Sequence, residues 1–156
     1  MDRFEFQLAM LQKGAEELEK KIAAFTTIIL QLKTAAITLW VALIGWAFTL
    51  KVDLIIPVGY VIVFGFWYLE ATYWRVQYYC INRASAIVQY LNNQDALDES
   101  FARQSIPEGL VYPLQGLKTV KGASLWKALR APSIYIFYTF LLVVNSIIWL
   151  IAIYIP

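Results

Sequence analysis

The side chain with the clearest chemical potential is Glu70, an acid that directly follows an apolar run at residues 54–69. If the chain turns back on itself at about Val52, helical register places Glu70 level with Thr34, the neighbour of Lys33, and predicts an ion pair between Lys33 and Glu70. Ionisable groups at membrane depth often form gates, proton sites or ligand contacts. We favour a simpler interpretation, in which the pair fixes the register of a hairpin or Glu70 is solvated at the membrane boundary.

Two arginines further along the chain, Arg75 and Arg83, carry the charge needed to bind an anion. The same register places Arg83 within reach of the carboxylate of Glu17 or Glu19, so we expect a salt bridge between the two helical segments at this point. In the alternative interpretation Arg75 and Arg83 are anion ligands of the cytoplasmic part, with Arg103 as a more distant addition.

Asn145 is an amide in the middle of the last apolar segment, within the sequence VVNSII. Hydrocarbon offers no water to an amide, and hydrogen bonds between membrane helices contribute about 0.6–2 kcal/mol. We therefore expect Asn145 to bond to another helix, either in the same subunit or in a second one. A bond to its own backbone together with Ser146 is the remaining alternative.

The residue types that catalysis usually needs are scarce. The chain has no His and a single cysteine, Cys80, so the commonest general base, an intramolecular disulfide and a Cys cluster for zinc are all excluded. It also has no acid pair at catalytic spacing and no Gly-rich phosphate loop. We expect a protein that is not an enzyme and that uses no metal or cofactor. A net charge of +2, with 11 acids among the bases, argues against nucleic acid as a partner.

The composition predicts an all-α integral membrane protein. Hydrophobic residues make up 60% of the 156 residues, and the mean hydropathy is +0.59. Three apolar runs are predicted to cross the bilayer, at residues 34–50, 54–69 and 134–156. With these spans, all 13 Lys and Arg residues except Lys51 lie on one side. Positive charge in short loops stays in the cytoplasm, so we expect a multi-pass inner-membrane protein with a cytoplasmic N-terminus and its C-terminus outside.

The segments next to the first two spans are predicted to be amphipathic helices. Spacings of four and three alternate through the first 32 positions, which is a heptad pattern that favours packing against another helix. The apolar positions are Phe4, Leu8, Leu11, Ala15, Leu18, Ile22, Phe25, Ile29 and Leu32. A second stripe ends before Asn92-Asn93, where a left-handed Asn would stop the helix. Its members are Leu69, Tyr73, Val76, Cys80, Ala84, Ile87 and Leu91.

These features divide the chain into three parts. Residues 1–93 are expected to form a long helical hairpin, whose arms extend from the two spans into the cytoplasm and pack together. Residues 94–131 form a cytoplasmic and interfacial segment, with a short helix at about 95–103 and a basic stretch, LKTVKGASLWKALRAP, at the headgroup boundary. Residues 132–156 form the third transmembrane helix.

An amphipathic helix that leads into a two-span hairpin and returns as a helix containing YWRVQYYCINRASAIVQYL resembles the SLATT-type two-transmembrane effector families. These families belong to prokaryotic conflict and nucleotide-signalling systems. The resemblance covers about residues 1–93 and carries no catalytic residues. It implies a protein that oligomerises in the inner membrane and permeabilises it when a cytoplasmic sensor protein or a nucleotide signal activates it.

Two functions stay open on these grounds. The first is a homo-oligomeric inner-membrane effector that perturbs or permeabilises the bilayer in antiphage defence, with the heptad seam binding other copies. The second is a non-conducting accessory or scaffold subunit of a larger membrane complex, which the scarcity of polar residues in the spans favours. The expected partners are the lipid bilayer, further copies of the chain, and a sensor protein or nucleotide signal.

Overall fold

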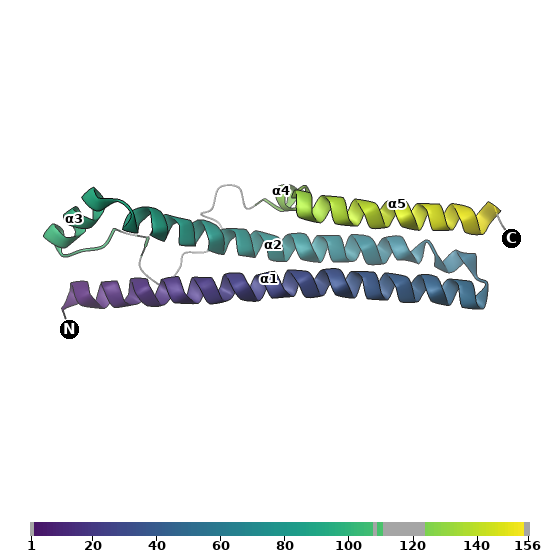
Figure 1. The fold of residues 1–156 in the computed structure, drawn as a ribbon, viewed down its shortest axis with the longest axis horizontal. Coiled ribbons are helices and arrows are strands. Elements are labelled where there is room, and N and C mark those ends of the chain that lie inside the picture. The colour runs from purple at the N-terminus through teal and green to yellow at the C-terminus, as the bar shows by residue number, and fades with distance from the viewer. Residues whose placement is uncertain (1, 108, 111–123, 155–156) are drawn as a thin grey trace. The chain divides into compact units, whose positions relative to one another are not determined.

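The computed structural model describes residues 2–107, 109–110 and 124–154, and every regular element in these ranges is helical. The elements are α1 (Arg3–Leu50), the short 3-10 helix η1 (Asp53–Ile55), α2 (Val58–Leu91), α3 (Gln94–Arg103), α4 (Leu125–Leu129) and α5 (Pro132–Tyr154) (Figure 1). Three helical stretches, α1, η1 with α2, and α5, are long and apolar enough to cross a membrane. The prediction of an all-α chain with three such helices is confirmed.

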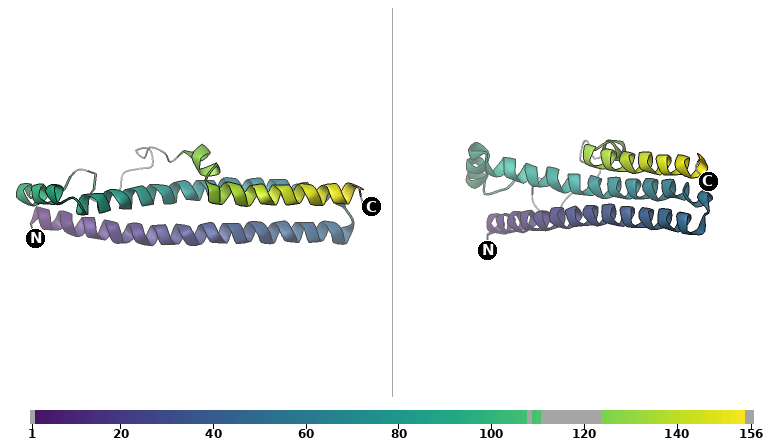
Figure 2. Two further views of the ribbon diagram at one scale, coloured as in Figure 1. Left: turned by 45° about the horizontal axis from the view of Figure 1, so that its top comes forward. Right: turned by 45° about the vertical axis from the view of Figure 1, so that its right-hand side comes forward.

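The chain divides into two compact units, which we describe separately. The apolar unit contains residues 27–75 and the described residues from 124 onwards, and the arm unit contains the described residues of 1–26 and 76–123. Within the apolar unit, segments of α1, α2 and α5 run side by side, as Figures 1 and 2 show from three directions.

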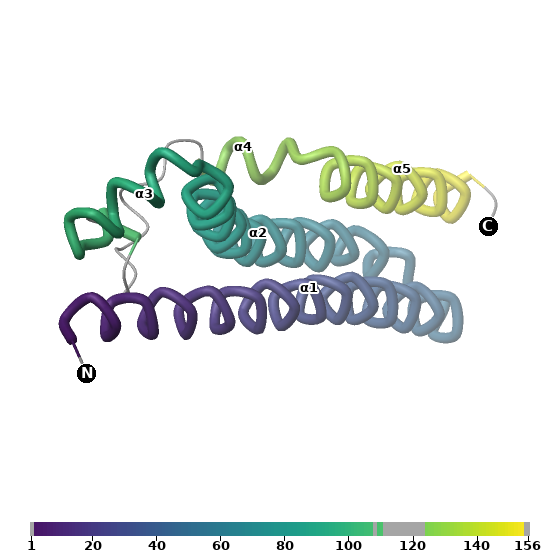
Figure 3. Tube along the Cα trace, turned by 60° about the vertical axis from the view of Figure 1, so that its left-hand side comes forward, coloured from purple at the N-terminus to yellow at the C-terminus, as the bar shows by residue number. Residues whose placement is uncertain are grey.

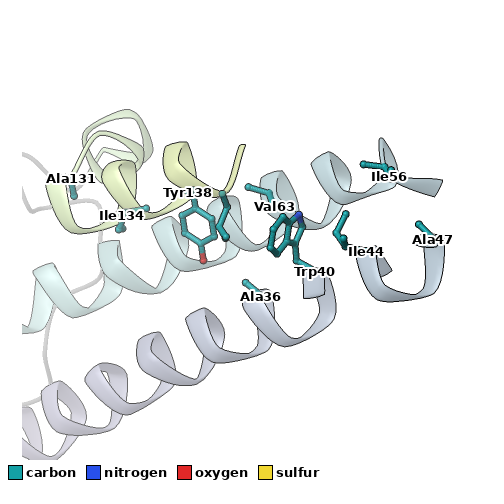
Figure 4. Close-up of a cluster of buried hydrophobic side chains, with 10 residues drawn as sticks. Ala36, Trp40, Ile44, Ala47, Ile56, Val63, Ala131, Ile134 and Tyr138 are labelled. Atoms are coloured by element: carbon teal, nitrogen blue, oxygen red, sulfur yellow. The ribbon is translucent and has the colours of Figure 1, made fainter. Parts of the chain in front are cut away.

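The core of the apolar unit lies between these three helical segments. Figure 4 shows Trp40 of α1 and Tyr138 of α5 pointing into the space between the helices. Small side chains on α1 let the backbones approach, because Ala36 and Ala47 are buried beside the larger groups. The buried cluster consists of Ala36, Trp40, Ile44, Ala47, Ile56, Val63, Ala131, Ile134, Tyr138 and Leu141.

The hairpin turn begins where α1 ends, at a residue with left-handed backbone. Lys51 has φ 55°, its N–H donates to the Phe48 carbonyl, and the N–H of Val52 donates to the Ala47 carbonyl. This pair of bonds is the Schellman arrangement, which satisfies carbonyls that the last helical turn leaves open. The chain therefore reverses direction in a short turn, as predicted from the three residues, 51–53, that separate the first two apolar runs.

The second long helix starts later than the predicted span 54–69. Residues Asp53–Ile55 form η1, and Pro57 directly precedes the first residue of α2, Val58. Proline has no N–H to donate, so it fits the position before a helix, where that group would lack a helical acceptor. Its carbonyl still accepts the N–H of Tyr60 at 3.1 Å.

In the arm unit, the heptad stripe of α1 packs as predicted. Phe4, Leu11 and Leu18 are buried, and Leu8, Ala15, Ile22 and Phe25 pack against the same cluster. The ring of Phe4 also makes an edge contact with the ring of Phe101 on α3, at 5.3 Å between centroids. Figure 3 shows α3 at the same end of this unit as the start of α1.

The stripe predicted for α2 is only partly right. Cys80 and Ile87 are buried and Ala84 packs beside them, but Leu69, Tyr73 and Leu91 are exposed. In the arm unit, the pattern missed the buried residues Tyr79 and Tyr90, each of which is next to a member of the predicted stripe. Tyrosine has a polar tip that lowers its apparent hydropathy, although its ring buries a large apolar area.

The helix ends at Leu91, as predicted, but not for the predicted reason. Asn93 has an extended backbone (φ −98°, ψ 100°), and its side chain accepts the N–H of Ala96. It is therefore the N-cap of α3, a position that Asn favours strongly. The left-handed residue lies at the other end of α3, where Gln104 has φ 52°.

Candidate functional site

The central polar group of the apolar unit is formed by Glu70, Lys33 and Tyr138, which come from three different helices. Glu70 is 0% exposed, and its Oε1 lies 3.3 Å from Nζ of Lys33. The Tyr138 hydroxyl donates a hydrogen bond to Oε2 at 2.9 Å. The ion pair predicted from hairpin register is confirmed. The alternative of a Glu70 solvated at the membrane boundary is wrong, because α5 covers the carboxylate.

Lys33 has partners on α5 as well as on α2. Its Nζ donates to the Ser133 carbonyl at 3.1 Å and lies 5.4 Å from the centre of the Phe137 ring. No described residue donates an aligned hydrogen bond to Oε1 of Glu70, so the Lys33–Glu70 contact is an electrostatic one. The Lys33 side chain is 23% exposed. It therefore links the buried carboxylate to the surface of the unit.

Tyr138 is the member of this group that sequence reasoning missed. It lies on a buried stripe of α5 with spacings of 4, 3 and 4, formed by Ile134, Tyr138, Leu141 and Asn145. The ring of Trp67 stacks on the ring of Tyr138, with centroids 6.0 Å apart. The stripe was a readable signal, because it places a hydroxyl and an amide on the same face of an otherwise apolar helix.

A second polar group surrounds Asn145, which is 0% exposed. Trp40 Nε1 donates to Asn145 Oδ1 at 2.8 Å, and Asn145 Nδ2 donates to the Ile56 carbonyl at 3.4 Å. The predicted contact between helices is confirmed, and both partners belong to the same subunit. Gly59 makes the contact feasible, because a Cβ there would collide with Oδ1 of Asn145.

Ser146, the neighbour of Asn145, forms a third link between helices. Its hydroxyl donates to the Leu142 carbonyl at 2.8 Å, so the hydroxyl of Tyr60, 2.7 Å away, donates to Ser146 Oγ. The polar side chains that face the interior of the apolar unit are thus bonded to one another. This arrangement holds three helices in one register, and the side chains that it places beside the buried acid are the Lys33 amine and the Tyr138 hydroxyl.

The two arginines singled out in the sequence fall in different units. Arg75 is a half-buried residue of the apolar unit, whereas Arg83 belongs to the arm unit. The salt bridge expected between Arg83 and Glu17 or Glu19 is absent among the described residues. Within the part of the chain that the structure describes, Nε and Nη2 of Arg83 are instead buried without a hydrogen-bond acceptor. Register sets the level of a residue along a neighbouring helix, but the rotation of the helix decides which way its side chain faces.

Replacing Arg83 with methionine is expected to stabilise the protein by about 1 kcal/mol, because buried N–H groups without acceptors cost roughly 1–3 kcal/mol each. Methionine keeps the apolar length of the side chain. Chemical unfolding of the purified chain measures the change. Arg103→Met is the matched control, because Arg103 pairs with Glu99 on the surface of α3 and such pairs contribute little. A loss of stability in Arg83→Met that Glu17→Gln reproduces would instead show that the two side chains pair in solution.

Cys80 is buried in the arm unit, ten residues beyond Glu70 on α2. Burial raises the pKa of its thiol, and the nearby charge of Lys21 only partly opposes this effect. The thiol is therefore protonated at neutral pH, and the thiolate needed for nucleophilic chemistry is scarce.

The geometry of these side chains carries the functional argument for this chain. Comparison of the chain with protein-family models, curated proteins and solved structures finds no match.

Proposed function

We propose that this protein is a homo-oligomeric effector of the prokaryotic inner membrane, which permeabilises the bilayer in antiphage defence when its copies assemble. The observation that carries the proposal is a polar stripe on the exposed face of α1. Three long apolar helices supply the spans. The distribution of Lys and Arg supports a cytoplasmic N-terminus and an external C-terminus.

The stripe consists of exposed residues at spacings of four and three on α1. Thr27, Gln31, Thr34 and Thr38 line a shallow groove together with Leu30, Ala35 and Leu39. Two further exposed residues, Gly45 and Thr49, lie on the same face, and Gly45 follows Thr38 after two helical turns. The hydroxyls of Thr34 and Thr38 donate to the carbonyls of Leu30 and Thr34, at 3.1 and 2.8 Å. Both hydroxyls are therefore satisfied within α1.

A second copy of the chain fits this face better than lipid does. Small residues let membrane helices approach closely, and Thr and Gln can bond across the contact. Gln31 is exposed on this face, so its amide can bond to a neighbouring copy or to water. A ring of such faces would place Gln31 and the threonines around a central polar path.

The alternative is a non-conducting accessory or scaffold subunit. One observation favours it: the most buried polar side chains, Glu70 and Asn145, are bonded within the subunit and line no path through it. In that case the α1 face would receive a different membrane protein.

The test measures the oligomeric state of the purified protein and the membrane potential of the cells that express it. The wild-type chain is expected to purify in mild detergent as a uniform homo-oligomer and to collapse the membrane potential of the cells that express it. Thr34→Leu with Thr38→Leu should reduce both effects, because bulky side chains separate the α1 faces. Val143→Leu, on an exposed position of α5, is the matched control and should change neither.

Either of two results would overturn the proposal. If the purified protein is a monomer and cells at full expression keep their membrane potential, the proposed effector function is wrong. Obligate co-purification with a different membrane protein establishes the scaffold alternative.

A further inference from the structure

The short helix α4 is attached to the apolar unit at the level where α5 begins (Figure 1). Trp67 Nε1 on α2 donates to the carbonyl of Leu129, the last residue of α4, at 3.1 Å. Ala128 of α4 is fully buried, whereas Trp126 is 63% exposed. The contact therefore fixes α4 while leaving its aromatic side chain at the surface.

An apolar cavity of about 370 Å³ lies between α4, α2 and α5. Its walls include Phe64 and Trp67 of α2, Trp126 and Leu129 of α4, and Tyr135 of α5. Phe64 stacks on Trp67, with ring centroids 6.1 Å apart, so this wall is continuous. A cavity with aromatic and aliphatic walls accepts a hydrocarbon chain and offers little to a polar solute.

The other side of α4 carries positive charge. A second cavity of about 470 Å³ is lined by Lys127, Arg130, Ser124 and Trp74, and Trp126 and Arg130 line both cavities. The guanidinium of Arg130 lies 4.5 Å from the centre of the Trp126 ring. This stacking orients a planar group that can donate two parallel hydrogen bonds to one phosphate.

We propose that these two adjoining cavities form a binding site for one anionic phospholipid, with an acyl chain against Phe64 and Tyr135 and the phosphate at Arg130 and Lys127. The apolar and cationic cavities meet at α4, as the apolar and charged parts of a phospholipid meet at its glycerol. Basic pockets next to membrane helices bind anionic headgroups in this way. The site rests on the proposed membrane location, but it does not depend on oligomerisation or permeabilisation.

The level of the site along the helices supports a lipid over a soluble anion. Tyr135 lies two residues beyond Ser133, whose carbonyl binds Lys33, and Trp67 precedes Glu70 by three residues. The site therefore lies beside the Lys33–Glu70 pair, where the sequence places the inner boundary of the bilayer. Tryptophan and tyrosine concentrate at this depth.

The experiment measures lipid binding to the delipidated full-length protein in detergent. Phosphatidylglycerol is expected to raise the unfolding temperature by about 2–4 °C and to stay bound in native mass spectrometry, since a ligand that binds only the folded state stabilises it. Phosphatidylcholine should have less effect, because its choline cation cancels the charge of the phosphate. Inorganic phosphate should have little effect, because it lacks the acyl chains.

Substitutions then locate the site. Arg130→Gln is expected to weaken phosphatidylglycerol binding about tenfold, which corresponds to one charged hydrogen-bond contact. Lys127→Gln should weaken it less, and it serves as a second readout if Arg130→Gln folds poorly. Arg103→Gln removes an exposed arginine of α3 and should leave binding unchanged.

Equal stabilisation by phosphatidylglycerol and phosphatidylcholine would overturn the proposal, because binding would then not depend on the net negative charge of the headgroup. Equal binding by Arg130→Gln, Lys127→Gln and wild type would also overturn it. If the protein binds phosphatidylglycerol selectively but leaves the membrane potential intact, the lipid site is supported and the proposed effector function is wrong.

Discussion

Replacing Lys33 with methionine is expected to destabilise the apolar unit by about 3–5 kcal/mol, the typical cost of removing one partner from a buried ion pair. Glu70 is 0% exposed, and without Lys33 its described hydrogen-bond partner is the Tyr138 hydroxyl. A carboxylate in this position must either stay charged with one hydrogen bond or take up a proton. Both outcomes cost free energy that the wild-type pair avoids.

A double variant distinguishes the interaction energy of the Lys33–Glu70 pair from the contacts that each side chain makes with other residues. Lys33→Met with Glu70→Met removes both charges and replaces them with apolar groups of similar volume, so it should recover most of the lost stability. Glu70→Met alone should cost less than Lys33→Met, because Lys33 is 23% exposed and keeps the Ser133 carbonyl. Unfolding of the purified protein in mild detergent gives the three free energies.

The exposed pair Arg103–Glu99 on α3 is the matched control. Its nitrogen and oxygen lie 2.9 Å apart, closer than those of Lys33 and Glu70, yet Glu99→Gln should change stability by less than about 1 kcal/mol. If Lys33→Met costs no more than Glu99→Gln, burial does not strengthen the pair and Glu70 must reach water by another route.

The Lys33–Glu70 contact was predictable from sequence for a physical reason. The turn at Lys51 is short and both helices continue without a break through the paired level, so counting residues from the turn gives the level of each side chain. The same count failed to identify a partner for Arg83. A short turn fixes which residues of the two helices lie at the same position along the helix axis. The rotation of each helix about its axis, which decides the direction of a side chain, depends on the whole packed face.

Counting residues from a turn could not predict the contacts of the third long helix, α5. α5 is joined to the hairpin through a long connection, so no turn fixes which of its residues face Glu70 or Trp40. The sequence identified Asn145 as an amide in need of a partner, but not that the partner is the Trp40 indole. The spacing of the α5 stripe places the Tyr138 hydroxyl on the same face as Asn145, but its bond to Glu70 and the role of Gly59 follow only from the packed position of α5.

Replacing Gly59 with alanine is expected to destabilise the protein by about 2–3 kcal/mol, through overpacking and the loss of a buried hydrogen bond. The new methyl group would collide with Asn145 Oδ1 and come within 3.2 Å of Trp40 Nε1. Either α5 moves away from α2, or Asn145 turns and leaves the indole N–H without an acceptor. The atoms in the way belong to a buried amide that is held from two sides, so a small shift cannot relieve the contact.

Gly65 supplies the matched control within the same helix. A Cβ at Gly65 would have no heavy atom of the described neighbouring residues within 4 Å, so Gly65→Ala should stabilise α2 by about 0.5–1 kcal/mol through helix propensity alone. The two identical substitutions are therefore expected to have opposite signs in the same unfolding assay. Adding Asn145→Ala to Gly59→Ala should restore part of the loss, because the obstructing amide is gone. If both alanine variants stabilise the protein equally, α5 does not pack against Gly59 and the bond between Trp40 and Asn145 does not hold the three helices together.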